Sequence, residues 1–311
     1  MRGFLILATV LLAVPFSGSA YATNVAIIVM LHAMAAIGLA LLMGYTGQIS
    51  LGHSAFYGLG AYGSAILTVK LGINGWLAIP IALSATGLIC YGLGWIIFRL
   101  RGHHLAVATL GVAIIVYVAF VELRQWTGGP NGLTGIKPLA LFGFAFEGDE
   151  RFFVLAYLAF LGVVWVAMNL VSSPIGLAMR GIAESERAAA SLGTDVAALK
   201  RKILVLSGVL AALGGSLYAY YIGFVSPQPF SVVFSIKLLL MCAIGGFRNV
   251  IGVVLGVAFI TVITEPLQDL GYYDVVVFGV LLAVCMLIFP DGLPAGIMRL
   301  IRRARPRRLA Q

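Results

Sequence analysis

Charged side chains are scarce in this sequence. Asp, Glu, Lys and Arg make up 10% of its 311 residues, whereas soluble domains carry about 25%. Hydrophobic residues reach 61%, and uncharged runs recur along the chain, each close to the ~20 residues that cross a bilayer as a helix. The short alternating segments that build a membrane β-barrel are missing. These features predict an all-α, polytopic membrane protein with a single transmembrane domain over residues 1–311.

Cysteines and catalytic motifs are also sparse. Cys90, Cys242 and Cys285 each lie in an apolar run without paired spacing, which argues against a disulfide framework or a zinc site. The sequence has no Gly-x-x-x-x-Gly-Lys-Ser/Thr phosphate loop, no His-Glu-x-x-His and no Gly-x-Ser-x-Gly. We therefore expect no enzymatic activity and no cofactor on this chain.

The apolar runs and the basic residues together predict ten crossings. Basic clusters beside apolar runs mark the cytoplasmic side of a membrane, so the net charge of +9 indicates contact with anionic lipid rather than with nucleic acid. With both termini in the cytoplasm, ten crossings place every basic cluster inside and the acidic loops, 147–150 and 265–274, outside. The expected spans are 4–21, 25–43, 54–69, 76–98, 105–121, 152–171, 203–223, 231–246, 250–266 and 275–289. The basic clusters are Arg2, 99–104, 180–202, Arg248 and 299–308, the last within a basic cytoplasmic tail at 297–311.

The first run has a second interpretation. Arg2, the apolar stretch up to Phe16 and the small residues from Ser17 to Ala22 also resemble a cleavable signal peptide. Cleavage would leave nine spans and an external N-terminus. Retention is favoured because the uncharged sequence continues past the cleavage site to Met43.

A polar, glycine-rich block interrupts the apolar sequence at residues 44–53, Gly-Tyr-Thr-Gly-Gln-Ile-Ser-Leu-Gly-His. Irregular backbone at membrane depth is tolerated only where it is buried in protein or lines a water-filled path. The block therefore predicts a broken or re-entrant segment in a protein that moves a solute. Gln48, Ser50 and His53 are expected either to line the translocation pathway or to brace the break with hydrogen bonds. Asn249, at a second glycine-rich stretch, is a weaker candidate of the same kind.

Residues 172–202 form the most polar internal stretch on the predicted cytoplasmic side. Ser173 followed by Pro174 is typical of a helix start. Residues 184–193, Glu-Ser-Glu-Arg-Ala-Ala-Ala-Ser-Leu-Gly, predict a short helix ended by its final glycine, and Asp195 is expected to cap the next helix. The alanine-rich helix is either a surface that another protein binds or an ordinary interfacial connector.

Four stretches, in order along the chain, resemble the branched-chain amino-acid permeases of ABC importers. They extend over nearly the whole sequence, and the chain is more similar to the M-type permease of this family than to its H-type partner. The stretches are residues 47–56 with 60–62, then 127–133, then 184–193 with Lys200, Ser207 and 211–219, and finally 289–293.

The resemblance implies a multi-pass permease subunit of a bacterial inner membrane that assembles with a second homologous permease subunit. Two separate ATP-binding subunits would hydrolyse ATP with Mg²⁺, and an external substrate-binding protein would deliver leucine, isoleucine or valine. The loop at 172–202 would then be a coupling loop whose helix docks in a groove of the ATPase. The residues expected to contact the ATPase are Glu184, Glu186, Ala188, Ala189 and Gly193.

The sequence also departs from the family pattern. Within the second glycine-rich stretch, residues 245–253, Arg248 stands in place of a glycine and Val253 in place of a proline. Lys237 is a charge within an apolar run. These differences leave the substrate open, so permeases of the same family for urea, short amides or aromatic acids are alternatives. An ion-coupled secondary transporter is a further alternative, although no Asp or Glu lies mid-span to relay the coupling ion.

Overall fold

The computed structural model describes residues 19–100, 102–141 and 144–264, together with Thr9, Leu12, Pro15 and Gly279. The acidic loop at 265–274, the basic tail and most of the first and tenth predicted spans lie outside these residues.

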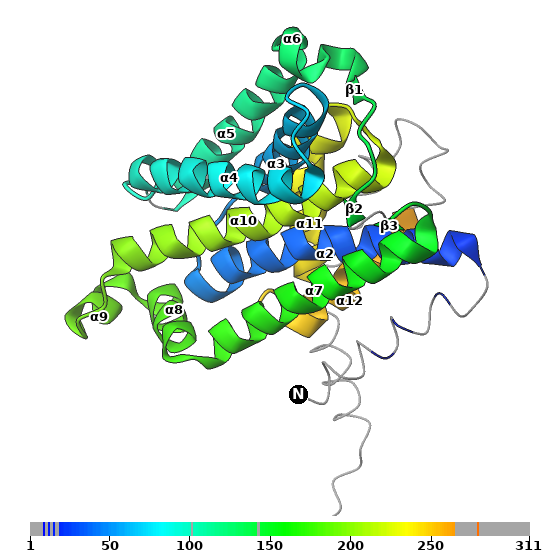
Figure 1. The fold of residues 1–311 in the computed structure, drawn as a ribbon. Helices are drawn as coiled ribbons and strands as arrows, with labels where there is room; N and C mark the ends of the chain where they lie inside the picture. Colours follow the sequence, from blue (N-terminus) through cyan, green and yellow to red (C-terminus); the bar gives the residue numbers. More distant parts are fainter. Residues whose placement is uncertain are drawn as a thin grey trace, which may run out of the picture.

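Eleven α-helices and four two-residue strands make up the described part of the chain (Figure 1). The helices are α2 (Ala20–Thr46), α3 (His53–Val69), α4 (Gly75–Ile97), α5 (His103–Glu122), α6 (Arg124–Thr127), α7 (Asp149–Ser172), α8 (Pro174–Glu184), α9 (Glu186–Ser191), α10 (Val196–Ile222), α11 (Val232–Gly245) and α12 (Val250–Thr264). The strands are β1 (Leu133–Thr134), β2 (Ala140–Leu141), β3 (Phe144–Ala145) and β4 (Phe224–Val225), and short 3-10 turns occupy Gly129–Asn131 (η2) and Gln228–Phe230 (η3).

Each predicted span from 25–43 to 250–266 coincides with one helix as far as the described residues reach, at Thr264. Five of these helices, α2, α4, α5, α7 and α10, are long and apolar enough to cross a membrane, and α11 and α12 are shorter apolar helices. The prediction of an all-helical, multi-span fold is therefore confirmed for the described residues.

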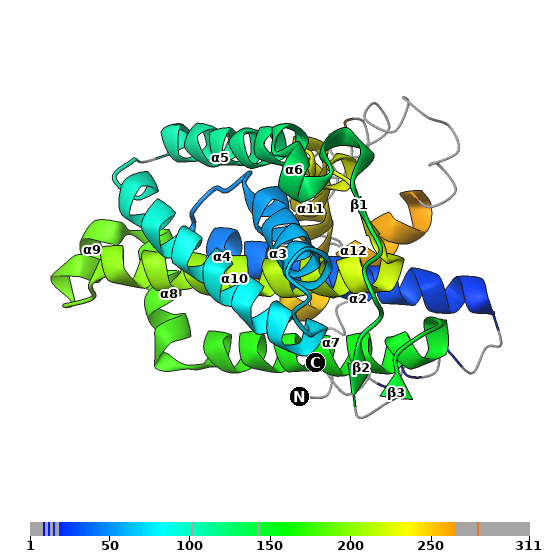
Figure 2. The ribbon, with the colours of Figure 1, turned by 45° about the horizontal axis from the view of Figure 1, so that its top comes forward.

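Two helices form the centre of the bundle. In α2 and α10 the most apolar stretch is 83% and 72% buried, whereas in α4, α5 and α7 it is only 22–33% buried. Figures 1 and 2 show α2 and α10 side by side, with α7 along one flank and α4 and α5 on the other. A helix that is apolar on all sides belongs in a core or in lipid. The central pair is buried by protein, and the peripheral helices present their apolar faces outward.

Glycine permits the tightest packing in the bundle, between α3 and α10. A Cβ atom on Gly60 of α3 would overlap the carbonyl oxygen of Ala212, and one on Gly215 of α10 would overlap the carbonyl oxygen of Tyr57. Helices in lipid lack a hydrophobic drive toward one another, so small residues that admit close backbone contact hold them together. This packing fixes the position of α3 relative to the centre of the bundle.

Different segments of the chain lie at the two ends of the bundle. One end, here called the β1 end, joins the start of α4 to the loop before α7 through a hydrogen bond from Trp76 Nε1 to the Ala140 carbonyl oxygen (2.9 Å). At the same end the hydroxyl of Thr68, in α3, lies 2.6 Å from that of Tyr220, in α10, and β1 pairs with β4. The opposite end carries α8 and α9 (Figure 2) and is called the α9 end. This arrangement agrees with the predicted alternation of direction from α2 to α10.

Candidate functional site

The chain breaks where the glycine-rich block predicted it. Helix α2 ends at Thr46, Gly47 adopts a left-handed conformation (φ +68°), and α3 begins at His53. A glycine in this conformation is a common helix stop because it has no Cβ to clash. The side chains of Gln48, Ser50 and His53 are all buried. The chain is therefore interrupted between α2 and α3 as predicted, and the polar side chains of the interruption are enclosed by protein. Its re-entrant placement in a membrane stays a prediction.

The break extends from the α9 end into the bundle. Gln48 Nε2 donates to Glu186 Oε1 (3.4 Å) at the α9 end, and Glu186 is paired with Lys200 near the start of α10. His53 Nε2 instead lies 2.6 Å from the hydroxyl of Ser207. Ser207 follows Lys200 by seven residues, which is about 10 Å along a helix. Helix α3 therefore begins well inside the bundle.

Hydrogen bonds determine the orientation of the His53 ring. The Ser207 hydroxyl donates its hydrogen to the Gly38 carbonyl oxygen (2.6 Å), so it accepts from His53 Nε2. His53 Nδ1 then accepts from the hydroxyl of Ser50 (3.2 Å), and this network assigns the neutral Nε2–H tautomer. Both ring nitrogens are used within the chain, and they brace the break. A direct contact of His53 with a transported solute stays a prediction.

Helix α11 also begins inside the bundle. Phe230, just before it, packs against Tyr62 in the middle of α3, with ring centroids 5.8 Å apart. In the first turns of α11, the Ser235 hydroxyl accepts from the Ser54 backbone N–H (2.9 Å) and caps the start of α3. Helix α11 has 14 residues, so it is about 21 Å long, shorter than the ~30 Å hydrocarbon core. The predicted span at 231–246 is thus a short helix that starts inside the bundle.

Buried polar atoms without partners lie next to these two helix starts. The hydroxyls of Tyr57 and Tyr62 and Nδ1 of His32 have no hydrogen-bond partner among the described residues. The rings of His32 and Tyr57 both pack on Phe234, in the first turn of α11, with centroids 5.1 and 5.0 Å away. Buried polar groups are nearly always hydrogen-bonded, so these atoms could bind a polar solute. No role was predicted for these three residues from the sequence, although His32 is a polar ring within a long apolar run.

The loop at 172–202 contains two short helices, α8 after the predicted start at Ser173 and α9 within the predicted helix at 184–193. The Ser173 hydroxyl accepts from Gly176 N (3.3 Å) and starts α8, as predicted. Ser185 is extended (φ −159°), and its hydroxyl accepts from Ala188 N. A serine in this conformation caps a new helix. The prediction for 184–193 is therefore wrong in its boundary: Glu184 ends α8, and α9 starts at Glu186.

The end of this loop follows the prediction. Gly193 is left-handed (φ +84°) after α9, and Asp195 Oδ1 accepts from Ala198 N (2.9 Å) at the start of α10. A left-handed glycine and an aspartate cap are ordinary signals for a helix stop and a helix start.

Two ion pairs connect this loop to the rest of the α9 end. Glu186 pairs with Lys200, whose side chain is only 6% exposed, and Glu184 Oε1 pairs with Arg248 Nη2 at 3.0 Å. Arg248 Nε donates to the Gly44 carbonyl oxygen (3.2 Å). The loop is thereby tied to the end of α2 and to the turn between α11 and α12. We call Gln48, Glu184, Glu186, Lys200 and Arg248 the junction.

The residues expected to contact an ATPase fall into two groups. Glu184 and Glu186 pair with cations of this chain, and Ala189 is buried. Ala188 and Gly193 are exposed. Leu192, between them, is 86% exposed, and its role was not predicted from the sequence. The available signal was a large apolar side chain directly before the glycine that ends the short helix.

Asn249 lies apart from the His53 group. It is exposed, and its Oδ1 accepts from Gly252 N (3.1 Å) at the start of α12. This contact is an ordinary helix cap, and a role of Asn249 in the pathway stays a prediction.

Comparisons with known proteins agree on one family. A profile described as "Branched-chain amino acid transport system / permease component" matches residues 21–289. The chain is 32% identical over 302 aligned positions to the high-affinity branched-chain amino acid transport system permease protein LivM of Escherichia coli K12, covering 90% of this chain and 71% of that protein. It is 25% identical to the probable branched-chain amino acid transport permease protein LivM of Methanocaldococcus jannaschii, covering 63% and 61%. It is 28% identical to the autoinducer 2 import system permease protein LsrC of Escherichia coli SMS-3-5, covering 74% and 69%. No solved structure matches.

Proposed function

The chain belongs to the branched-chain amino acid transport permease family, and we propose that it is the M-type permease subunit of an ATP-driven importer of leucine, isoleucine and valine. The chain is a multi-pass membrane permease and not itself an enzyme. The observation that carries the proposal is the 32% identity to a LivM permease over 90% of the chain. The distribution of acidic residues supports it over an ion-coupled transporter. In the described residues every Asp and Glu lies in a loop or at a helix end, where it cannot relay an ion across the membrane.

The assembly follows from this proposal. A second homologous permease subunit completes the transmembrane core, two ATP-binding subunits hold ATP and Mg²⁺, and an external binding protein delivers the substrate. We place the α9 end in the cytoplasm because the basic residues Arg180, Lys200, Arg201 and Arg248 gather there, and we retain ten crossings with both termini inside.

The junction offers a route from the ATPase to the pathway. The exposed face of α9 would contact the ATP-binding subunit, and Glu186 joins that helix to Gln48 in the break. Glu184 joins the same loop to Arg248, in the turn between α11 and α12. A displacement of α9 would therefore reach the segment that leads into α3 and the turn that follows α11. Both helices begin inside the bundle, as discontinuous helices around transporter sites do.

A competition assay tests the substrate. The chain is reconstituted in proteoliposomes with its three kinds of partner subunit, and uptake of radiolabelled leucine is measured with ATP inside the vesicles. We expect tenfold excess unlabelled isoleucine or valine to reduce leucine uptake at least fivefold, and urea, acetamide or phenylalanine to leave it unchanged. Competition by urea, an amide or an aromatic acid, without competition by valine, would assign the chain to another branch of the family.

A further inference from the structure

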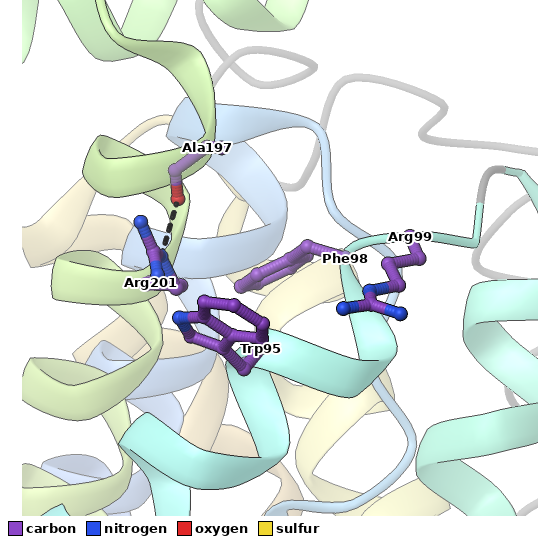
Figure 3. Close-up of a pocket in the computed structure, with 6 residues that line it drawn as sticks. Trp95, Phe98, Arg99, Ala197 and Arg201 are labelled. Atoms are coloured by element: carbon purple, nitrogen blue, oxygen red, sulfur yellow. Dashed lines mark hydrogen bonds between the residues drawn. The ribbon is translucent and has the colours of Figure 1, made fainter.

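A pocket outside the proposed pathway lies at the α9 end, between the end of α4 and the start of α10. Its volume is about 250 Å³. Figure 3 shows the side chains of Trp95 and Phe98 between those of Arg201 and Arg99. The residues that line the pocket are Gly94, Trp95, Phe98, Arg99, Ala197 and Arg201. No acidic side chain is among them.

Both arginines are held by aromatic rings and not by carboxylates. The guanidinium carbons of Arg99 and Arg201 lie 5.4 and 5.9 Å from the centre of the Trp95 ring, within the range of cation–π attraction. Arg201 also lies 5.8 Å from the ring centre of Tyr91, and its Nε donates to the Ala197 carbonyl oxygen (3.3 Å). Neither arginine forms an ion pair with any described residue. The ion pairs among the described residues at the α9 end are those of Lys200 with Glu186 and of Arg248 with Glu184. The terminal N–H groups of two guanidinium ions are therefore available at one pocket.

The surroundings of the pocket are those of a membrane interface. On the outer face of α4, Leu88 is 74% exposed and Ile96 is 69% exposed, while Tyr91 and Trp95 are about half exposed. Aromatic rings concentrate where the hydrocarbon meets the headgroups. The pocket thus lies where an apolar surface suited to acyl chains meets two cationic groups.

From this geometry we propose that the pocket binds the phosphate of an anionic glycerophospholipid in the leaflet at the α9 end. Guanidinium groups bind phosphate oxygens through paired N–H···O bonds, and basic pockets between transmembrane helices on the cytoplasmic side bind anionic headgroups. The acyl chains would lie along Leu88 and Ile96. The apolar rim favours a lipid over free inorganic phosphate, which would gain nothing from it. The proposal depends on the position of α4 in the membrane and not on which solute is transported.

Native mass spectrometry of the purified transporter complex tests this site. The complex is equilibrated in nanodiscs that contain equal amounts of phosphatidylglycerol and phosphatidylcholine, and the ratio of the two retained lipids is measured. We expect Arg201→Gln and Arg99→Gln each to lower the ratio at least fivefold. Lys202→Gln removes the same charge from the adjacent exposed residue, which does not line the pocket, and should change the ratio less than twofold.

The other outcomes overturn the proposal. An unchanged ratio in both arginine variants would show that the pocket does not select the lipid. Displacement of phosphatidylglycerol by millimolar inorganic phosphate would assign the site to a soluble anion. Loss of the second permease or of the ATP-binding subunits from the Arg99→Gln complex would assign the pocket to a protein interface. Arg99 is exposed, so that variant is expected to fold even if Arg201→Gln does not.

Discussion

Leu192→Asp is expected to reduce ATP-driven uptake at least tenfold while the chain stays folded and inserted. Leu192 is 86% exposed, so its replacement removes almost no contact within this chain. If the exposed face of α9 docks on the ATP-binding subunit, the change forfeits about 1.5–3 kcal/mol of apolar burial and adds the cost of burying a carboxylate. Since 1.4 kcal/mol is a tenfold change in an equilibrium constant, the subunits should separate in detergent. Uptake in proteoliposomes and co-purification of the ATPase measure the two effects.

Leu71→Asp is the matched control. Leu71 is 57% exposed in the turn between α3 and α4, at the opposite end of the bundle. The same chemical change there should leave the ATPase bound. Normal uptake by Leu192→Asp would contradict the coupling role of α9. Leu192 is a sharper test than Ala189, because a large side chain at the buried Ala189 would disturb this chain's own packing.

Glu186→Gln should destabilise the protein more than Lys200→Met, although both remove the same ion pair. The Lys200 side chain is 6% exposed and that of Glu186 is 39% exposed. Loss of the carboxylate leaves a buried ammonium ion unpaired, which costs about 3–5 kcal/mol for a fully buried pair. Because Glu186 is partly exposed, we expect Glu186→Gln to lower the free energy of unfolding by about 2 kcal/mol. Loss of the lysine leaves a carboxylate that water can solvate, at a cost of about 1 kcal/mol or less. Thermal unfolding of the purified complexes compares the two variants.

Glu184→Gln is the control, because it removes an ion pair that is exposed on both sides. Its partner is Arg248, and the two side chains are 72% and 57% exposed, so the stability change should stay below about 0.5 kcal/mol. The ratio of leucine imported to ATP hydrolysed adds a functional measurement, and we expect it to fall in Glu186→Gln because the link from α9 to Gln48 is weakened. Equal melting temperatures for Glu186→Gln and Lys200→Met would contradict the inference that the Lys200 ammonium ion is the buried charge of this pair.

Local signals in the sequence were sufficient to predict the helices and their caps. The apolar runs, Ser173 before Pro174, Asp195 before α10 and the glycine block after α2 each act within a few residues, and the structure has a helix or a break at each. Ser185 is the local exception. It reads as an ordinary residue of an alanine-rich helix, yet its hydroxyl caps α9 instead, because serine stabilises a helix start better than a helix interior.

Long-range contacts account for what the sequence could not predict. The pairing of Glu186 with Lys200 and Gln48 depends on how α9 folds back against the break. The start of α11 inside the bundle depends on the packing of Phe230 against α3. The partnerless hydroxyl of Tyr57 is defined only by the helices around it. Neither apolar periodicity nor capping residues encode such contacts.

Uptake with and without the ATP-binding subunits tests the central claim most directly. Proteoliposomes that contain this chain, the second permease subunit and the external binding protein are prepared with or without the ATPase, and leucine uptake is followed with ATP or a non-hydrolysable analogue inside. The account predicts uptake only when the ATPase and hydrolysable ATP are both present. Leucine accumulation by vesicles that lack the ATPase, driven by a proton or sodium gradient, would contradict it.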